Sequence, residues 1–101
     1  MKIKSKKWIE REALKEWRNQ VLCRDEYKCQ ICEYKSSKPH VHHIIPQQVK
    51  ELKFDIDNGI TLCFNHHKVG VHSPHMNALW FFMWLQQNKP KQFESLIEKV
   101  K

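Results

Sequence analysis

Two short spacings of cysteine and histidine could hold a metal ion. Cys29 and Cys32 are separated by two residues, and so are Cys63 and His66. Three thiolates and one imidazole form one of the closed tetrahedral ligand sets used by structural zinc. An ion that closed the roughly thirty residues between the two pairs would stabilise a core with little margin of its own. We therefore predict a structural zinc at these four residues.

Four cysteines could instead form disulfides in a secreted protein. The basic residues at the N-terminus are followed by no apolar run, so we expect no secretory signal. The C-x2-C spacing beside a histidine-rich region favours thiolate ligands in a reducing cytosol. Cys23 lies outside both pairs, near Val21 and Leu22 on a helical face, which predicts a buried free thiol.

All seven histidines lie between residues 40 and 75, and four of them form two adjacent pairs. His42 and His43 follow one another in a β-branched run, so their side chains would point to opposite faces of a strand. One could bind an ion while the other acts as a base. His67 would lie about 100° from His66 around a helix, free of the zinc and able to meet His42. With only two protein ligands, an ion would keep the open coordination positions that catalytic metals need. The alternative is that these histidines bind no metal and are solvated or satisfied core residues.

The elements that would position these residues alternate between helix and strand. Apolar residues at helical spacing predict an amphipathic helix over residues 8–24. Short β-branched runs predict strands at residues 41–45 and 60–62, which could pair as a hairpin with a long loop. Asp57-Asn58-Gly59 before the second strand is typical of a turn.

Helices are expected after the second strand. One should begin at Asn65, carry the second histidine pair and stop near Gly70. Ser73 followed by Pro74 predicts an N-cap and first turn of another helix, whose aromatic residues favour core packing. A last amphipathic helix should follow Pro90.

Composition fits one α+β domain spanning residues 1–101. We divide it into a basic tail and helix (1–24), a metal-binding core (25–72) and C-terminal helices (73–101). The net charge of +7 favours a polyanionic partner such as nucleic acid or an anionic membrane surface, although charge alone can also serve solubility. No stretch approaches about 18 consecutive apolar residues, which excludes a transmembrane helix.

Three separated pieces of sequence occur in the order and at the distances of a known motif. They are Val41-His42-His43-Ile44-Ile45-Pro46, Asp57-Asn58-Gly59-Ile60-Thr61-Leu62-Cys63 and His66-His67-Lys68. Together they resemble the HNH endonucleases, and Cys29-Gln30-Ile31-Cys32 resembles the zinc-bearing branch of that family. The size of the chain is similar to that of small HNH proteins in bacteriophage and prophage genomes. The resemblance covers about half of the chain, residues 24–72.

The resemblance implies a ββα-metal (His-Me finger) core with a zinc knuckle, flanked by helices. His42, where many members have aspartate, would bind a catalytic divalent ion together with His67. His43 would be the general base that takes a proton from the attacking water. Asn58 would pin the loop between the strands and so orient the base. The ion would stabilise the phosphate and the leaving 3′ oxygen, giving 5′-phosphate ends.

His72 resembles a second helical ligand of some family members. It stands five residues after His67, which on a continuous helix is about 140° away. It could share the ion only if the helix broke near Gly70. His40 and His75 are expected to lie outside the chemistry, in a surface loop and in the first turn of the next helix.

The implied activity is hydrolysis of DNA phosphodiester bonds, by nicking or by double-strand cleavage. Mg²⁺, Mn²⁺, Ni²⁺ or Zn²⁺ would be the catalytic ion beside the structural Zn²⁺. Arg24, Lys28 and Lys68 could contact DNA phosphates. No stretch resembles a module that reads sequence, so we expect weak sequence specificity, or specificity delegated to a partner or to DNA structure.

The resemblance also implies a biological setting. It points to a cytoplasmic protein, encoded by a phage or prophage in a bacterial host, acting beside the terminase and other packaging proteins as a monomer or homodimer. Two alternatives remain at this stage: a non-catalytic, zinc-stabilised DNA-binding protein, and an accessory subunit of a larger nuclease. The joint presence of His43 and His67 favours the enzyme.

Overall fold

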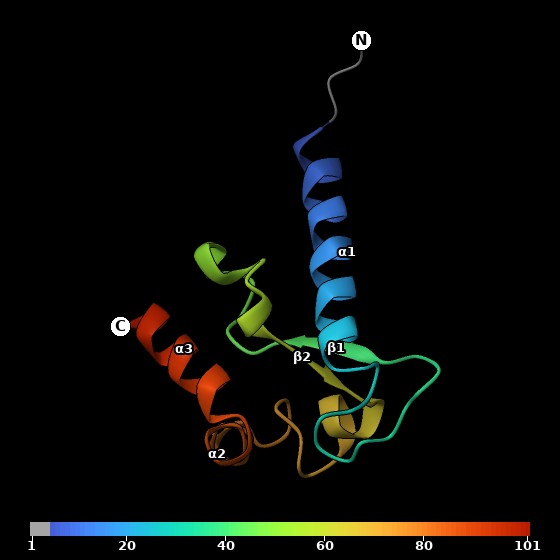
Figure 1. Cartoon of the computed structure of the whole chain (residues 1–101), viewed down its shortest axis with the longest axis vertical. Helices are drawn as coiled ribbons and strands as arrows, with labels where there is room; N and C mark the ends of the chain where they lie inside the picture. Colours follow the sequence, from blue (N-terminus) through green and yellow to red (C-terminus); the bar gives the residue numbers. More distant parts are fainter. Residues whose placement is uncertain (1–4) are drawn as a thin grey trace.

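The computed structural model describes residues 5–101, so part of the predicted basic tail, residues 1–4, lies outside the described residues. Within them, helices of different lengths and two short strands form an α+β chain (Figure 1). In order, the elements are α1 (Lys6–Arg24), β1 (His40–His43), η1 (Lys50–Leu52), η2 (Ile56–Asn58), β2 (Gly59–Leu62), η3 (Asn65–Val69), α2 (Ala78–Asn88) and α3 (Pro90–Val100). No helix of this part of the chain is long and apolar enough to cross a membrane.

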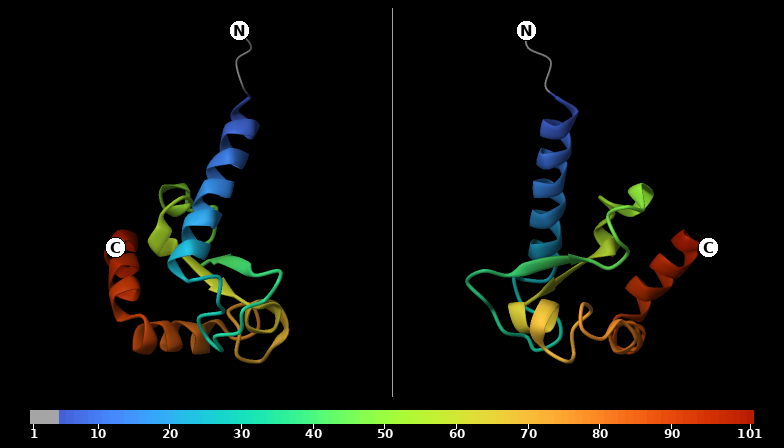
Figure 2. Two further views of the ribbon diagram at one scale, coloured as in Figure 1. Left: turned by 45° about the vertical axis from the view of Figure 1, so that its right-hand side comes forward. Right: turned by 180° about the vertical axis from the view of Figure 1, so that it is seen from behind.

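Helix α1 stands on the sheet by its C-terminal end, and its N-terminal turns project away from the other elements (Figures 1 and 2). The Ser5 side chain caps it by accepting a hydrogen bond from the Trp8 amide, so it begins two residues before the predicted start. Its buried residues are Trp17, Val21 and Leu22. Cys23 is exposed, so our prediction of a buried thiol is wrong. The buried face of α1 contains Val21 and Leu22 but not Cys23.

Strands β1 and β2 form a two-stranded antiparallel sheet, with His42 opposite Ile60. Strand β1 ends two residues before the predicted limit. The amides of Ile44 and Ile45 turn instead to the backbone carbonyl and the side chain of Asn58. Gly59 lets α1 lie directly on β2, because a Cβ there would fall 2.6 Å from Val21 Cγ2.

The main core lies on the other side of the sheet, under the C-terminal helices. It contains Ile44, Ile60, Leu62, Phe81, Leu85 and Leu96, together with the two buried cysteines Cys29 and Cys63. Pro90 opens α3 as the sequence predicted. The sheet is thus held between α1 on one side and α2 and α3 on the other, which fixes both strands that carry the predicted site.

The start of α2 corrects the sequence prediction. Ser73 forms a single turn, in which its hydroxyl donates to the Gly70 carbonyl at 2.6 Å and accepts from the Met76 amide. The helix begins at Ala78, where the Asn77 side chain accepts from the Trp80 amide at 3.0 Å. Asn77, and not Ser73, is therefore the N-cap of α2. Residues 70–77 precede the helix and fold back towards the sheet.

Candidate active site and metal centres

The four residues predicted to bind zinc lie together. Cys32 Sγ is 3.8 Å from Cys63 Sγ, and His66 Nδ1 is 3.3 Å from Cys63 Sγ and 3.8 Å from Cys29 Sγ. In a tetrahedral zinc site, two sulfur ligands are about 3.8 Å apart and a sulfur and a nitrogen about 3.6 Å. The separations therefore fit the edges of a Cys3His tetrahedron, and the thiols are free rather than paired as disulfides.

Backbone geometry at two places brings these ligands together. Cys29 and Cys32 sit on a tight knuckle, where the Glu33 amide donates to the Cys29 carbonyl at 2.7 Å and Glu33 has a φ of 63°. Cys63 follows β2 directly, and His66 lies in the single π-helical turn η3. This cluster therefore ties the knuckle to the end of the sheet.

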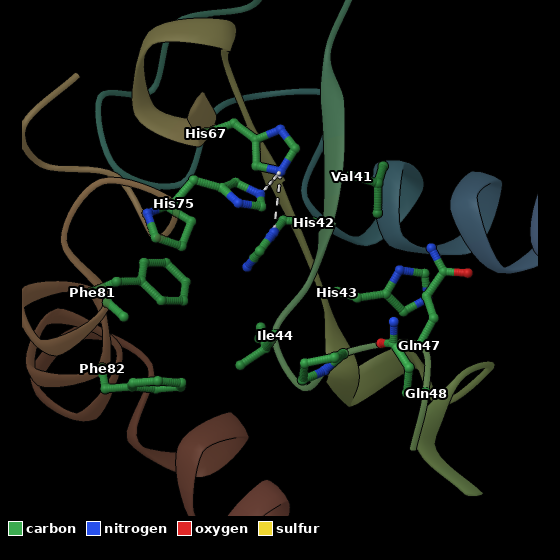
Figure 3. Close-up of a pocket in the computed structure, with 13 residues that line it drawn as sticks. Val41, His42, His43, Ile44, Gln47, Gln48, His67, His75, Phe81 and Phe82 are labelled. Atoms are coloured by element: carbon green, nitrogen blue, oxygen red, sulfur yellow. Dashed lines mark hydrogen bonds between the residues drawn. The ribbon is translucent and has the colours of Figure 1, made fainter. Parts of the chain in front are cut away.

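A second cluster consists of three histidines from three elements. His67 Nε2 is 3.1 Å from both His42 Nδ1 and His75 Nε2 (Figure 3). Two nitrogens bound to one ion at the usual 2.0–2.1 Å are about 3.0 Å apart at a right angle and about 3.4 Å apart at the tetrahedral angle. His67 Nε2 thus lies at a separation that one divalent ion could span from each of the other two nitrogens, and all three lie within 4.8 Å of one another.

The histidine cluster includes two predicted residues and one that was not expected. His42 and His67 meet as predicted. His75 joins them because the turn at Ser73 folds the chain back, so its ring faces His67. His72 lies elsewhere, stacked on Trp80 with ring centroids 4.5 Å apart. The chain does break at Gly70, but the break directs His75 rather than His72 to the cluster.

Burial favours the neutral form of His42 and of His67 at ordinary pH. Burial, with a smaller contribution from neighbouring histidines, lowers the pKa of His42 to about 3 and that of His67 to about 4. A neutral imidazole has a free lone pair, which is the form that binds a metal ion. His42 and His67 can therefore each offer a lone pair to a cation.

His43 occupies the other side of β1 from His42, as strand alternation predicted (Figure 3). Its ring stacks on Trp17 with centroids 3.9 Å apart and an angle of 11° between the planes. Its Nε2 donates to the Lys53 carbonyl at 2.9 Å, which leaves Nδ1 as the proton acceptor. Burial lowers the pKa of His43, and the hydrogen bond to that carbonyl opposes the shift.

One pocket of about 800 Å³ is lined both by the histidine cluster and by His43. Its lining includes the cluster residues His42, His67 and His75, and also His43. The aromatic side chains Phe81 and Phe82 close it on the side of α2 (Figure 3). A substrate entering this pocket could therefore meet an ion site and a base together.

Asn58 fastens the loop that leads out of β1. Its side chain is fully buried, and Oδ1 accepts from the Ile45 amide at 2.6 Å. Its Nδ2 donates to the carbonyls of Ile45 and Leu52 at 2.9 and 3.0 Å. Leu52 directly precedes Lys53, and the Lys53 carbonyl accepts the hydrogen bond from the His43 ring. Asn58 thus holds the loop backbone beside the carbonyl to which the His43 ring donates.

Asn58→Ala should lower the free energy of unfolding by about 2–4 kcal/mol, because each buried group left unpaired costs about 1–3 kcal/mol. Urea unfolding of the zinc-loaded protein measures this effect. Asn19→Ala, at an exposed position on α1, is the control and should leave the stability nearly unchanged. Equal stabilities for the two variants would contradict the assigned role of Asn58.

The three cations proposed to contact DNA have different surroundings. Arg24 donates to both Asp25 carboxylate oxygens and to the carbonyls of Ile56 and Gly59, so its guanidinium joins α1 to β2. Lys28 Nζ lies 4.0 Å from Oε2 of the exposed Glu26. Lys68 is near enough to His42 and His67 to contribute to lowering the pKa of both. Among these three, Lys68 is therefore best placed to meet a phosphate at the cluster.

Comparison with known proteins finds one similarity, in the central part of the chain. The family model described as HNH endonuclease matches residues 29–69. No curated protein and no solved structure matches the chain. The matched segment contains the Cys3His cluster, His42, His43, Asn58 and His67, whereas Trp17 and His75 lie outside it.

Proposed function

We propose that this protein hydrolyses DNA phosphodiester bonds. Residues 29–69 match the HNH endonuclease family model, which suggests a nuclease or nucleic-acid-binding function. The observation that carries the proposal is one pocket whose lining includes both the three-histidine cluster and the separately held His43. A protein that only bound DNA would need neither. The net charge of +7 further suits a polyanionic substrate.

His42, His67 and His75 would hold the divalent ion in this reaction. When bound, the ion would supply a Lewis acid that offsets negative charge on the phosphate and on the leaving oxygen. The candidates are Mg²⁺, Mn²⁺, Ni²⁺ and Zn²⁺. A set of three imidazoles favours Ni²⁺ or Zn²⁺, because Mg²⁺ prefers carboxylate, carbonyl and water oxygens.

His43 would act as the general base. Its Nδ1 would take a proton from a water molecule as the water oxygen bonds to phosphorus. The bond from phosphorus to the 3′ oxygen would then break, solvent would protonate that oxygen, and a 5′-phosphate would remain. The hydrogen bond to the Lys53 carbonyl and the stack on Trp17 keep the accepting nitrogen in place.

The remaining residues would support this site. Zn²⁺ at Cys29, Cys32, Cys63 and His66 would fix the end of β2 and the turn that carries His67. Lys68 would contact a DNA phosphate. The resemblance to small phage-type proteins further motivates a cytoplasmic role beside a phage terminase, as a monomer or homodimer.

His75→Ala should raise the dissociation constant for Ni²⁺ at least about tenfold, because removing even a residue that only supports a metal ligand typically costs 10–100-fold. Calorimetric titration of protein that already carries one zinc measures this constant. His72→Ala is the matched control, since His72 stacks on Trp80 outside the cluster. Equal losses, or no loss in either variant, would remove His75 from the ion site.

Relaxation of supercoiled plasmid by the purified, zinc-loaded protein tests the proposed function. Cleavage should require added Ni²⁺, Mn²⁺, Mg²⁺ or Zn²⁺, and a chelator should stop it. The cut ends should carry 5′-phosphates. Tight DNA binding without cleavage in any of the four ions would support the non-catalytic alternative instead.

A further inference from the structure

The two ring nitrogens of His67 face different partners. Nε2 lies 3.1 Å from both His42 Nδ1 and His75 Nε2, which defines the candidate ion site. Nδ1 lies 2.8 Å from His40 Nδ1, and the two rings meet edge to face at 87°. His67 therefore contacts the other two cluster histidines through Nε2 and His40 through Nδ1.

The contact with His40 has the geometry of a hydrogen bond rather than of a shared ion. The separation of 2.8 Å is a hydrogen-bond distance, and it involves Nδ1 of His67 and not the Nε2 that faces the candidate ion site. If His67 offers the Nε2 lone pair to an ion, its single proton must reside on Nδ1. That N–H then donates to His40 Nδ1, and His40 carries its own proton on Nε2.

We propose that His40 is a positioning residue that fixes the tautomer and ring orientation of the metal ligand His67. The inference deepens the proposed function and rests on it, because it assumes that the histidine cluster binds an ion. Most metal-binding histidines donate their second N–H to a carboxylate, a carbonyl or water. Here a neutral imidazole accepts it and adds no negative charge to the site, which keeps the full charge of the ion available to a phosphate.

Strand geometry explains how one strand can supply both contacts. His40 and His42 are two residues apart on β1, so their side chains leave the same face of the strand. His40 meets Nδ1 of His67 and His42 meets Nε2. The Phe64 ring packs against His40, with ring centroids 5.7 Å apart and an angle of 70° between the planes. His67 is thus held between two residues of one strand.

Titration with Co²⁺ tests this role, because bound Co²⁺ has a visible absorption spectrum that depends on its ligands. The protein is first loaded with one zinc, which the thiolate cluster retains since zinc binds such sites more tightly than cobalt. His40→Ala should weaken Co²⁺ binding by about 10–100-fold. His40→Asn should restore binding to within a few-fold of wild type, because its amide oxygen can take the place of Nδ1.

His40→Gln and His72→Ala complete the set. Glutamine places its amide near the position of Nε2, so His40→Gln should remain as weak as His40→Ala. His72→Ala should bind as wild type does. Thermal unfolding of each zinc-loaded variant shows that it is folded, and if His40→Ala does not fold, the asparagine and glutamine variants decide the question.

The outcomes separate the inference from the proposed function. If wild type binds no Co²⁺ beyond its zinc, the ion site fails, and the role of His40 fails with it. If wild type binds Co²⁺ and folded His40→Gln binds it as tightly as His40→Asn, only the role of His40 is overturned. Weak binding by both the alanine and the glutamine variants, with rescue by asparagine, is the result that the structure predicts.

Discussion

His43→Ala should slow DNA cleavage by about 10²–10⁴-fold, the usual contribution of a positioned general base. The substitution removes the Nδ1 acceptor, while the three nitrogens of the ion cluster belong to other residues. DNA affinity and the number of bound ions should therefore stay unchanged. Single-turnover cleavage of a labelled duplex, with metal content measured on the same samples, gives both quantities.

Two further variants separate the chemistry of His43 from its packing. His43→Phe keeps an aromatic ring against Trp17 but has no nitrogen to accept a proton, so its loss of rate should match that of His43→Ala. His72→Ala removes a histidine outside the cluster and should cleave as wild type does. A His43→Phe protein with nearly full activity would show that another group acts as the base.

Cys63→Ser should destabilise the protein by more than about 3 kcal/mol. Structural zinc contributes about 10–16 kcal/mol of apparent binding energy in zinc-finger peptides, as much as or more than the whole stability of a typical domain. Cys63 is buried in the main core between β2 and η3, so its loss would also release the turn that carries His67. Thermal unfolding should show a fall of more than about 12 °C, or no cooperative transition.

The chain offers a matched control for this experiment. Cys23 is an exposed thiol outside the cluster, and Cys23→Ser should leave both the zinc content and the unfolding temperature unchanged. Removing the metal from wild-type protein with a strong chelator should reproduce the effect of Cys63→Ser. A chelated protein that keeps its unfolding temperature would contradict a structural role for the ion.

The parts of the site that the sequence could predict depend on local geometry. Cys63 and His66 are three residues apart, so the end of a strand and one helical turn suffice to bring them together. Strand alternation predicted opposite directions for His42 and His43. The turn signal at Asn58 and Gly59 placed the start of β2 within one residue. All three features follow from the spacing of residues close together in the sequence. The order of the motif segments along the chain additionally indicates which segments come together in the site.

The parts that the sequence could not predict depend on how distant segments pack. His75 reaches the cluster only because Ser73 ends a single turn and Asn77 begins the helix, and Ser73 followed by Pro74 resembles a helix start just as well. His40 has no spacing signal towards His67, since β1 must first pair with β2. Trp17 reaches His43 because Gly59 allows α1 to lie close to the sheet.

The account rests on the claim that the histidine cluster is the catalytic ion site. The most direct test is the cleavage rate of wild type and His67→Ala, each carrying one zinc, as Ni²⁺ is added. The wild-type rate should rise with Ni²⁺ and saturate at one added ion per chain, while His67→Ala should remain inactive over the same range. Equal Ni²⁺-dependent rates for the two proteins, or full wild-type activity without any added ion, would contradict the claim.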